Sequence, residues 1–595
     1  MASRLLALGR WIGDRLRQRP LPTWYAPTYR LPLPALEGQL GLEPRRADFV
    51  VWYLRHARVL AWRDVREPEL ITWEDMSRVH TADYLESLTR AETLARIFPS
   101  DPSEIPVDEL WVSVRLACGA TLAAARTALA RRGPTLNLLG GFHHAGPDRG
   151  GGLCAVNDIA VALAVLRAEG WSGRACVIDL DAHPPDGTAA CLARDASYWI
   201  GSLSGSDWGP LPTVDETVLP PRAGDEPYLA ALAGLLGRMP RPDLAFVLAG
   251  GDVLAGDHLG QLGLSLAGVR ERDLRVADAL DGIPSVWLPA GGYSHDAWRA
   301  LAGTALALAR GTSAPIPTRY NPLEARYSAI ATHMDHERLS GALGDDDFDL
   351  GLAGRRGGKR LLGYYTAQGI EYALFRYGLL DYVRRLGYQR FRIVINDPPA
   401  VGDRARLYGI VEGGEHLLID LVLERRRVSE ANLLYVHWLN LRNPRAHFSD
   451  RRPQMPGQDV PGLGLAREMG ELLGRMAERL GLEGVAFRPA WLHTAYAARY
   501  RMRFVDAARQ GRFEAMVRDF AGVPLREASE ALAGERVRMN GAPYRWEADE
   551  MAVFLDDKRA TAPEVVAAVA RERDRVHFSI DPTRAKALPP PPAIL

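Results

Sequence analysis

The stretch RACVIDLDAHPPDGT, residues 174–188, is a short apolar run that ends in a cluster of charged and polar side chains. The apolar part is nearly continuous, which is typical of a strand buried on both faces of a parallel sheet. Three other runs have the same character and are bounded by glycine or proline. These runs are PTLNLLG at 134–140, PDLAFVLAG at 242–250 and IPSVWLPA at 283–290.

Helical patterns lie between the four runs. IAVALAVLRAEG at 159–170 and YLAALAGLLGRM at 228–239 are two examples. Strand-like runs that alternate with helical patterns predict an α/β domain, in which helices flank a parallel sheet. We therefore expect the four runs to be neighbouring strands of one such sheet.

The composition limits the class of protein. At 595 residues the chain is too long for one ordinary core, so we expect two or three domains. Lys and Arg balance Asp and Glu at 73 each, so there is no strong signal for nucleic-acid binding. No apolar run reaches the roughly 18 residues of a membrane span. The four cysteines have no CxxC spacing, which favours a reducing compartment such as the cytoplasm over a disulfide framework.

Polar side chains follow each of the four predicted strands. Because ligands bind beyond the carboxyl ends of the strands in open α/β sheets, these side chains can converge on one site. The residues are His143 and His144 after the first run, Asp179, Asp181, His183 and Asp186 at the second, Asp252 at the third and Tyr293 at the fourth. Residues two apart on a strand share a face, so we expect Asp179, Asp181 and His183 to point the same way.

Two carboxylates and one imidazole with an open coordination position are the ligands of a catalytic zinc ion, which predicts a site at Asp181, His183 and Asp252. Zinc in such a site acidifies water and polarises a carbonyl. The tandem histidines could then transfer the proton and stabilise charge, and Tyr293 could donate to an oxyanion. Each pattern alone also has an ordinary explanation, such as a loop or a strand edge. Together they favour amide hydrolysis.

Five segments carry a family resemblance: RVHTADYLESL (78–88), GGFHHAGPDRGGGLCAVNDIAVA (140–162), DLDAHPPDGT (179–188), LAGGDVLAGDHLGQLGLSLAGV (248–269) and LPAGGY (288–293). They closely resemble the zinc-dependent histone deacetylase and acetylpolyamine amidohydrolase superfamily. The residues of the second and fourth segments are most similar to those of the class IV-like bacterial branch. The resemblance covers roughly residues 20–315 and implies an arginase/deacetylase-like parallel sheet flanked by helices.

The resemblance also implies roles for individual residues. The zinc ligands fall on Asp181, His183 and Asp252, and the oxyanion-stabilising tyrosine on Tyr293. The histidine pair falls on His143 and His144, the second as general base and acid, with Asp179 and Asp186 as carboxylate partners. A structural potassium ion would be framed by Asp179 and the backbone carbonyls of Asp181 and His183. No residue is assigned to an organic cofactor.

The chain departs from the family pattern after the ligand histidine, where Pro184 and Pro185 stand. Proline restricts its own backbone and that of the preceding residue, so the pair could change how Asp186 reaches His144. We interpret it as a change that tunes the site. The alternative is a binding module that recognises acyl-lysine but turns over poorly because Asp186 is misplaced.

The predicted substrate-binding residues are Gly152, Leu153 and Trp208. Leu153 stands where the family commonly has an aromatic wall of the lysine tunnel. A wider aliphatic wall would suit a bulkier acyl chain or a less lysine-selective substrate. Trp208 is either the opposite wall or a core residue.

The residue composition changes after about residue 311, where a turn-rich segment begins and a segment rich in acidic residues and glycine follows. We predict a catalytic domain at 1–318, a linker at 319–356, an α+β domain at 357–585 and a proline-rich, extended tail at 586–595. In the second domain, LLYVHWLNL (433–441) predicts a strand, and the loop PGLGL (461–465) leads into a helix.

A further strand, GVAFRPA (484–490), and a helix, HTAYAARYRMRF (493–504), are predicted next. This order resembles the acyl-CoA-binding half of GNAT acyltransferases, although Asp459 stands where those enzymes usually have Gln or Arg. The domain could therefore bind acyl-CoA, or it could be structural, regulatory or a docking site for a protein partner.

Together these features predict a zinc-dependent deacylase that hydrolyses the amide of an acyl-lysine in a protein, or of a small acylated amine. The two alternatives are the weakly catalytic binding module and a bifunctional protein whose second domain binds acyl-CoA.

Overall fold

The computed structural model describes residues 19–33, 36, 40, 42–192, 195–294, 296–311, 316, 320–341, 359–396, 401–449, 453–499, 501–556 and 562–581. The chain forms two compact units, Met1–Ala325 and Arg326–Leu595. The predicted proline-rich tail lies outside the described residues, as does much of the predicted linker. The described part of that linker contains helices α13 (Pro322–Ala331) and α14 (His336–Ser340).

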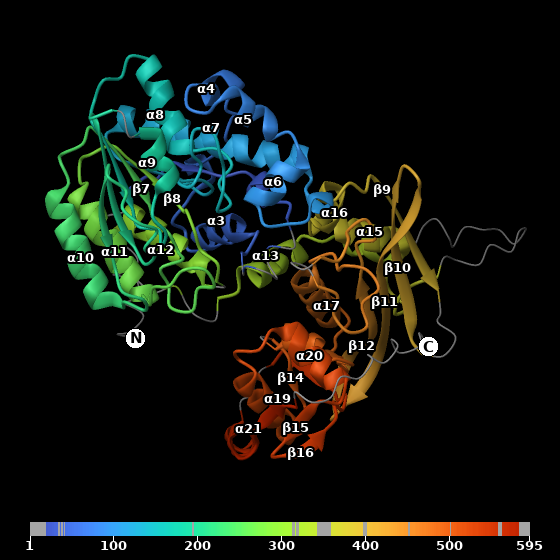
Figure 1. Cartoon of the computed structure of the whole chain (residues 1–595). Helices are drawn as coiled ribbons and strands as arrows, with labels where there is room; N and C mark the ends of the chain where they lie inside the picture. The colour runs from blue at the N-terminus through green and yellow to red at the C-terminus, as the bar shows by residue number, and fades with distance from the viewer. Residues whose placement is uncertain are drawn as a thin grey trace, which may run out of the picture. The chain divides into compact units, whose positions relative to one another are not determined.

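The described part of unit 1 is built on an eight-stranded sheet in the order β2-β1-β3-β8-β7-β4-β5-β6 (Figure 1). Every pair of neighbouring strands is parallel. The strands are β1 (Thr23–Trp24), β2 (Val65–Arg66), β3 (Pro134–Asn137), β4 (Ala175–Asp179), β5 (Tyr198–Ser204), β6 (Val214–Val218), β7 (Leu244–Leu248) and β8 (Ser285–Leu288).

The four runs predicted as strands are β3, β4, β7 and β8, and they are neighbours in the middle of the sheet. Every residue of β4, β7 and β8 is buried, which explains why these segments are nearly continuous in apolar side chains. The other four strands, β1, β2, β5 and β6, were not predicted from the sequence. β6 lies at the edge of the sheet and is polar and only half-buried, so it lacks that signal.

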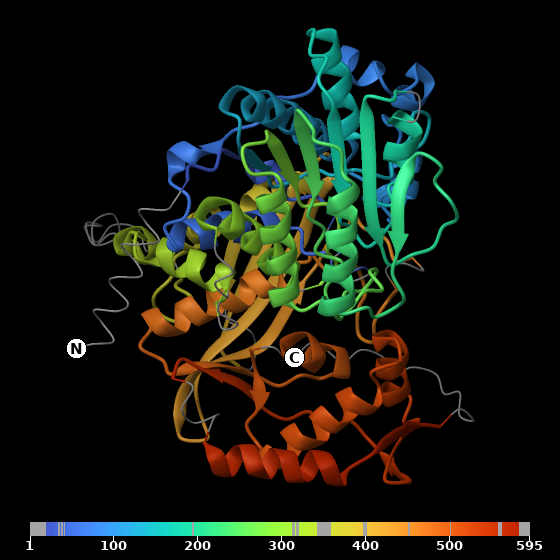
Figure 2. The ribbon, with the colours of Figure 1, turned by 90° about the vertical axis from the view of Figure 1, so that its left-hand side faces the viewer.

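Helices cover both faces of this sheet. The helices α7 and α8 pack together on one side, and α10, α11 and α12 pack in series on the other, with α3 against α12 (Figure 1). Figure 2 shows the strands side by side with helices in front of them. The α/β class is therefore confirmed. The helices are α3 (Arg46–His56), α4 (Trp73–Ser77), α5 (Ala82–Ser87), α6 (Ala91–Ile97), α7 (Val107–Arg131), α8 (Asp158–Ala168), α9 (Asp186–Leu192), α10 (Asp225–Arg238), α11 (Leu266–Ala279) and α12 (Ala297–Arg310), with 3-10 turns η1 (Pro27–Tyr29), η2 (Trp62–Asp64) and η3 (Pro102–Glu104).

The described part of unit 2 contains a seven-stranded sheet in the order β14-β17-β13-β12-β11-β10-β9 and a three-stranded sheet, β16-β15-β18. All pairs are antiparallel except β12 and β13. The strands are β9 (Arg390–Asn396), β10 (Asp403–Val411), β11 (Gly414–Val428), β12 (Ala431–Leu441), β13 (Gly484–Phe487), β14 (Arg503–Phe504), β15 (Val537–Met539), β16 (Ala542–Tyr544), β17 (Met551–Phe554) and β18 (Phe578–Ile580).

The helices of unit 2 complete an α+β region, as predicted. The order β12, α17, β13, α18 is the strand–helix–strand–helix order that the sequence predicts. The helix predicted over 493–504 ends earlier, because residues 503–504 form β14. The helices are α15 (Ala367–Arg376), α16 (Leu379–Arg385), α17 (Ala466–Arg479), α18 (Leu492–Ala498), α19 (Ala507–Asp519), α20 (Leu525–Ala533) and α21 (Pro563–Arg575).

None of the helices in the described ranges combines the length and the hydrophobicity that crossing a bilayer requires.

Candidate active site

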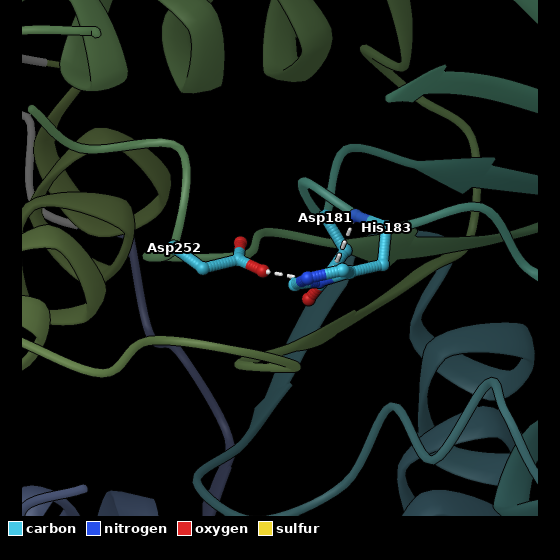
Figure 3. Close-up of side chains that lie close together, drawn as sticks. All are labelled: Asp181, His183 and Asp252. Carbon is cyan, nitrogen blue, oxygen red and sulfur yellow. Dashed lines mark hydrogen bonds and ion pairs between the residues drawn. The ribbon is translucent and has the colours of Figure 1, made fainter. Parts of the chain in front are cut away.

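Asp181, His183 and Asp252 meet at the carboxyl edge of the unit 1 sheet (Figure 3). The Nδ1 atom of His183 lies 3.0 Å from Oδ1 of Asp181 and 3.1 Å from Oδ2 of Asp252. One ligand atom from each residue lies within 4.8 Å of the others. The structure therefore brings together the three residues predicted as metal ligands.

The charges of this triad call for a cation. Burial, followed by the charge of Asp181, raises the pKa of Asp252 to about 7. Burial opposes protonation of His183, but Asp181 and Asp252 outweigh it and raise its pKa to about 11. A proton on His183 thus offsets the two buried carboxylates, which would otherwise be costly. One imidazole nitrogen and two carboxylates also form a donor set that zinc accepts.

The loops that carry the triad are fixed by main-chain contacts. The strand β4 ends at Asp179, so Asp181 and His183 lie in the loop after it. The prediction that Asp179, Asp181 and His183 share one face of a strand is therefore wrong. The backbone N–H of Gly291 donates to Oδ2 of Asp181 at 2.7 Å. The buried guanidinium of Arg272 donates to the carbonyls of residues 180 and 250, and so ties the two ligand loops together.

The tandem histidines lie beside the triad, with ring centroids 4.0 Å apart. The Nδ1 atom of His143 lies 2.9 Å from Oδ2 of Asp179, and that of His144 lies 2.8 Å from Oδ1 of Asp186. Both carboxylate partners predicted from the sequence are thus in place. Since each Nδ1 is engaged, each Nε2 is left to face the site.

The two histidines differ in charge. Burial opposes protonation of His143, but Asp179 and Asp181 outweigh it and raise its pKa to about 9. Burial, followed by the charge on His143, lowers the pKa of His144 to about 4. At neutral pH the first imidazole is therefore charged and the second is neutral, so only the second can accept a proton.

Pro184 and Pro185 do not move Asp186 away from His144. They directly precede α9, where proline is well tolerated because its missing N–H is not needed and its backbone angle suits a helix start. Asp186 is the first residue of that helix and keeps its hydrogen bond to His144. The physical reason for a catalytically weak binding module is therefore absent.

Tyr293 is buried beside the triad, in a loop held from two sides. Arg46 donates to the carbonyls of residues 290 and 291. The backbone N–H of Tyr293 donates to Oδ2 of Asp257 at 2.6 Å, while Oδ1 of Asp257 accepts from the N–H groups of residues 259 and 260. Burial and the charges of the triad raise the pKa of Tyr293 well above its usual value, so its hydroxyl remains a donor.

Trp208 lies over the site and not in the core, because it is 55% exposed. Its ring stacks on His144 with centroids 5.1 Å apart and lies 5.9 Å from His183. Gly152 lies against His144, where a Cβ would come within 2.4 Å of Cδ2 of that ring. Only glycine fits there.

Leu153 follows Gly152 with a left-handed backbone, φ +66°. Its N–H donates to the carbonyl of Ile97 at 3.1 Å. A non-glycine residue in this conformation is uncommon and costs of order 1 kcal/mol. The surrounding loop therefore holds Leu153 in one orientation next to the histidine pair.

A second set of oxygen atoms lies behind the histidine pair. Asp179 on β4 is the register partner of Ser202 on β5. The hydroxyl of Ser202 is fully buried and has no hydrogen-bond partner in the described part of the chain. An orphaned hydroxyl beside a carboxylate fits an alkali cation, which takes oxygen ligands.

Sequence analysis missed four residues that support the site: Arg46, His80, Asp257 and Arg272. His80 is buried; its Nδ1 lies 2.9 Å from the carbonyl of Gly146, and its Nε2 accepts the N–H of Asn157 at 3.0 Å. It thereby closes the loop that carries the tandem histidines. His80 and Asp257 lie within segments that carry the family resemblance, but their roles depend on contacts with residues far along the chain, as do those of Arg46 and Arg272.

This fold and geometry define an α/β protein with a candidate metal centre and a paired-histidine site at the carboxyl edge of its sheet. The family model described as "Histone deacetylase domain" matches residues 41–309. Histone deacetylase 2 of Arabidopsis thaliana is 30% identical over 305 residues, which cover 48% of this chain and 78% of that protein. The chain belongs to the histone deacetylase family.

Two other similarities each cover just under half of the chain. An uncharacterized Picosynechococcus protein is 29% identical over 294 residues, 46% of this chain and 93% of that protein. The crystal structure of a histone deacetylase homologue from Aquifex aeolicus matches with a TM-score of 0.40 at 21% identity. That match covers 47% of this chain and 81% of that one.

Replacing His80 by Gln should weaken the pH dependence of stability. Burial lowers the pKa of His80 to about 4, against about 6.5 in an unfolded chain. The unfolded chain therefore binds this proton more tightly, and stability falls as the pH drops from about 6.5 towards 4. Between pH 7 and pH 5 the wild type should lose about 2 kcal/mol more than His80→Gln, measured by urea unfolding. Equal losses would contradict this assignment, and His333→Gln, at an exposed site, is the control.

Proposed function

We propose that the protein is a zinc-dependent deacylase that hydrolyses the amide of an acyl-lysine in a protein or of a small acylated amine. The observation that carries the proposal is a geometric one: the Asp181–His183–Asp252 triad lies beside two histidines, and each histidine is held by an aspartate through its Nδ1 atom. This arrangement provides a cation site, a proton acceptor and a positive charge within one buried cluster. Metal-assisted amide hydrolysis can use all three.

Zinc held by Asp181, His183 and Asp252 would supply Lewis acidity that polarises the amide carbonyl and makes water easier to deprotonate. His144, neutral and held by Asp186, takes the proton from the attacking water and delivers it to the leaving amine. His143, held charged by Asp179, stabilises the negative charge that develops. Tyr293 donates its hydroxyl hydrogen to the oxyanion.

Trp208 and Leu153 are proposed as the two walls against which the acylated side chain lies, with Gly152 between Leu153 and His144. The stacking of Trp208 on His144 supports this assignment. An aliphatic wall at Leu153 leaves more room than an aromatic ring would, so we expect acyl chains longer than acetyl to be accepted.

A structural potassium ion is proposed at Asp179, with the backbone carbonyls of Asp181 and His183. The orphaned hydroxyl of Ser202 supports it and adds an oxygen ligand to this set. An ion there would fix the loop between β4 and α9, which carries Asp181 and leads directly to Asp186, the first residue of α9.

The cytoplasm is proposed as the compartment. All four cysteines are free in the structure, which fits a reducing environment. A docking role for a protein partner at residues 357–585 stays a prediction, as does acyl-CoA binding there.

The first test is release of acyl groups from a panel of acyl-lysine peptides and acylated amines, acetyl through long-chain, by the zinc-loaded protein. His144→Ala and Tyr293→Phe should each lower kcat by roughly 10²- to 10⁴-fold, because they remove the proton acceptor and the oxyanion donor. His333→Ala and Tyr364→Phe, both outside the site, are the matched controls. The proposal would be contradicted if the wild type released acyl groups no faster than the two site variants from every substrate of the panel.

Replacing Leu153 by Phe should shift the preferred substrate toward acetyl. The larger ring fills the space that a longer acyl chain would use, so kcat/KM should fall roughly tenfold or more for long chains and little for acetyl. Leu153→Met, which keeps the volume nearly constant, is the control. A chain-length profile unchanged in Leu153→Phe would remove Leu153 from the substrate wall.

Replacing Asp257 by Asn should lower kcat by roughly 10- to 100-fold through Tyr293. Asn keeps the acceptor for the turn at residues 259 and 260 but places an NH₂ group against the Tyr293 N–H, which breaks only the contact to the tyrosine loop. In a Tyr293→Phe background the same change should cost less than about twofold, because the two act as one unit. Full additivity would contradict this role. Asp243→Asn, whose carboxylate also accepts a distant backbone N–H, is the control.

A further inference from the structure

Residues 67–75, EPELITWED, lie along helix α7 in unit 1, where the start of α4 meets the first turns of α7 (Figure 1). Three alternate residues of this segment contact α7 at positions four residues apart, so the contacts follow one face of the helix. The contacts are the carbonyl of Glu69 against Gly119, where a Cβ would come within 1.9 Å of its oxygen, the N–H of Ile71 to the carbonyl of Arg115 at 3.2 Å, and the ring of Trp73 edge-on to that of Trp111 with centroids 6.3 Å apart. The segment is therefore fixed in one position on the surface of α7.

The side chains that surround this contact are apolar and open to solvent. Leu70 is 45% exposed, Trp73 is 42% exposed and Val112 is 37% exposed, while Trp111 is partly exposed. Ten large hydrophobic side chains are exposed in the described part of the chain, and three of them lie here. Apolar side chains that are gathered in this way, and not scattered singly, mark an interaction surface. We call these four residues the tryptophan patch.

Carboxylates border the tryptophan patch. Residues 67–75 and 107–112 contain six acidic residues and no basic residue, and each acidic residue lies within three positions of a patch residue along the chain. The six are Glu67, Glu69, Glu74, Asp75, Asp108 and Glu109. Of these, only Glu74 and Asp75 form an ion pair with a residue that the structure describes, and both pair with Arg78.

The neighbouring arginines do not balance this charge. Each of them has its own partner within the described ranges. Arg66 lies over the ring of Trp24 and donates to Thr127, Arg78 pairs with Glu74 and Asp75, Arg115 donates twice to the carbonyl of Ile71, and Arg126 pairs with Glu169. The six acidic residues and Glu169 thus stand against four arginines, which leaves the surface negative.

We propose that the tryptophan patch and its six carboxylates form a docking surface for a basic segment of a partner protein, rich in lysine or arginine. The face of a tryptophan ring attracts a cation, and the aliphatic stem of lysine or arginine packs against exposed apolar groups. The charged heads would then reach the surrounding carboxylates and form charge-assisted hydrogen bonds. The inference does not depend on deacylase activity.

The excess of negative charge decides between possible occupants. A neutral apolar partner would cover the carboxylates without pairing them, which is costly. A second copy of this chain bound through the same patch would place identical surfaces opposite each other, because a two-fold contact is self-complementary, and would bring like charges together. A basic segment satisfies both the rings and the carboxylates.

The test is the binding of a fluorescein-labelled peptide of repeated Lys-Ser to the full chain, followed by fluorescence anisotropy. A peptide of repeated Glu-Ser is the reference. The lysine peptide should bind saturably, and its Kd should rise roughly threefold or more when sodium chloride is raised from about 50 to about 300 mM, because salt screens the exposed carboxylates. The glutamate peptide should not bind.

Replacing Trp73 by Ala should raise the Kd of the lysine peptide roughly tenfold or more, because it removes an aromatic ring at the centre of the surface. Phe375→Ala is the matched control, since Phe375 is an exposed aromatic residue (51%) on α15 in unit 2. That variant should bind the peptide as the wild type does.

A charge variant tests the surface without touching its apolar contacts, and it decides the matter if Trp73→Ala does not fold. Glu69→Gln combined with Asp108→Asn should raise the Kd roughly threefold or more at low salt and make it less dependent on salt. Glu226→Gln combined with Asp278→Asn is the control, because these two acidic residues are exposed on α10 and α11.

Three outcomes would overturn the proposal. The first is no saturable binding of the lysine peptide to the wild type. The second is an equal Kd in the wild type, in Trp73→Ala and in the charge variant. The third is self-association of the wild type in light scattering that Trp73→Ala abolishes, without peptide binding, which would identify a second copy of the chain as the occupant.

Discussion

The burial of three carboxylates at one edge of the sheet governs the rest of unit 1. Asp179, Asp181 and Asp252 are at most 1% exposed; Asp181 and Asp252 belong to the triad, and Asp179 accepts the backbone N–H of Asp181 at 3.1 Å. Carboxylates that are buried close together cannot all remain ionised without positive charge nearby. The charged form of His143 provides part of that charge, and a cation held by the triad would provide the rest.

Two arginines satisfy the hydrogen-bonding needs of backbone carbonyl groups at the same edge of the sheet. Parallel strands end with carbonyl groups that no neighbouring strand satisfies, and a buried carbonyl without a partner is costly. Arg272 donates to the carbonyls of residues 180 and 250, and Arg46 to those of residues 290 and 291. Each arginine thus places one planar cation across the ends of chain segments, which fixes the loops and adds positive charge near the acids.

The sequence predicted the centre of the sheet and the polar residues that cluster at its edge, because both have local signals. Buried parallel strands are continuous in apolar residues, and the polar residues directly after them lie at one edge by topology alone. Asp257 and Arg46 have no such signal, since they contact a loop 36 and about 245 residues away. The strand alternation expected from Asp179 to His183 was wrong because β4 ends at Asp179, where main-chain pairing gives way to contacts made by the ligand loop.

The shifts of the pKa values of His143 and His144 in opposite directions show that adjacent histidines can differ in their chemical properties. Both residues are buried and both bond to an aspartate through Nδ1. The partner of His143 is fully buried, and Asp181 adds a second carboxylate 3.7 Å from Nε2, so the imidazolium is strongly favoured. Asp186, the partner of His144, is partly exposed, so solvent screens its negative charge. Its Oδ2 atom also lies 3.6 Å from Nη2 of Arg149, which offsets part of that charge. Burial then dominates at His144, and the neighbouring positive charge of His143 adds to it. One dipeptide therefore provides both a proton acceptor and a fixed cation because its two carboxylates differ in solvation.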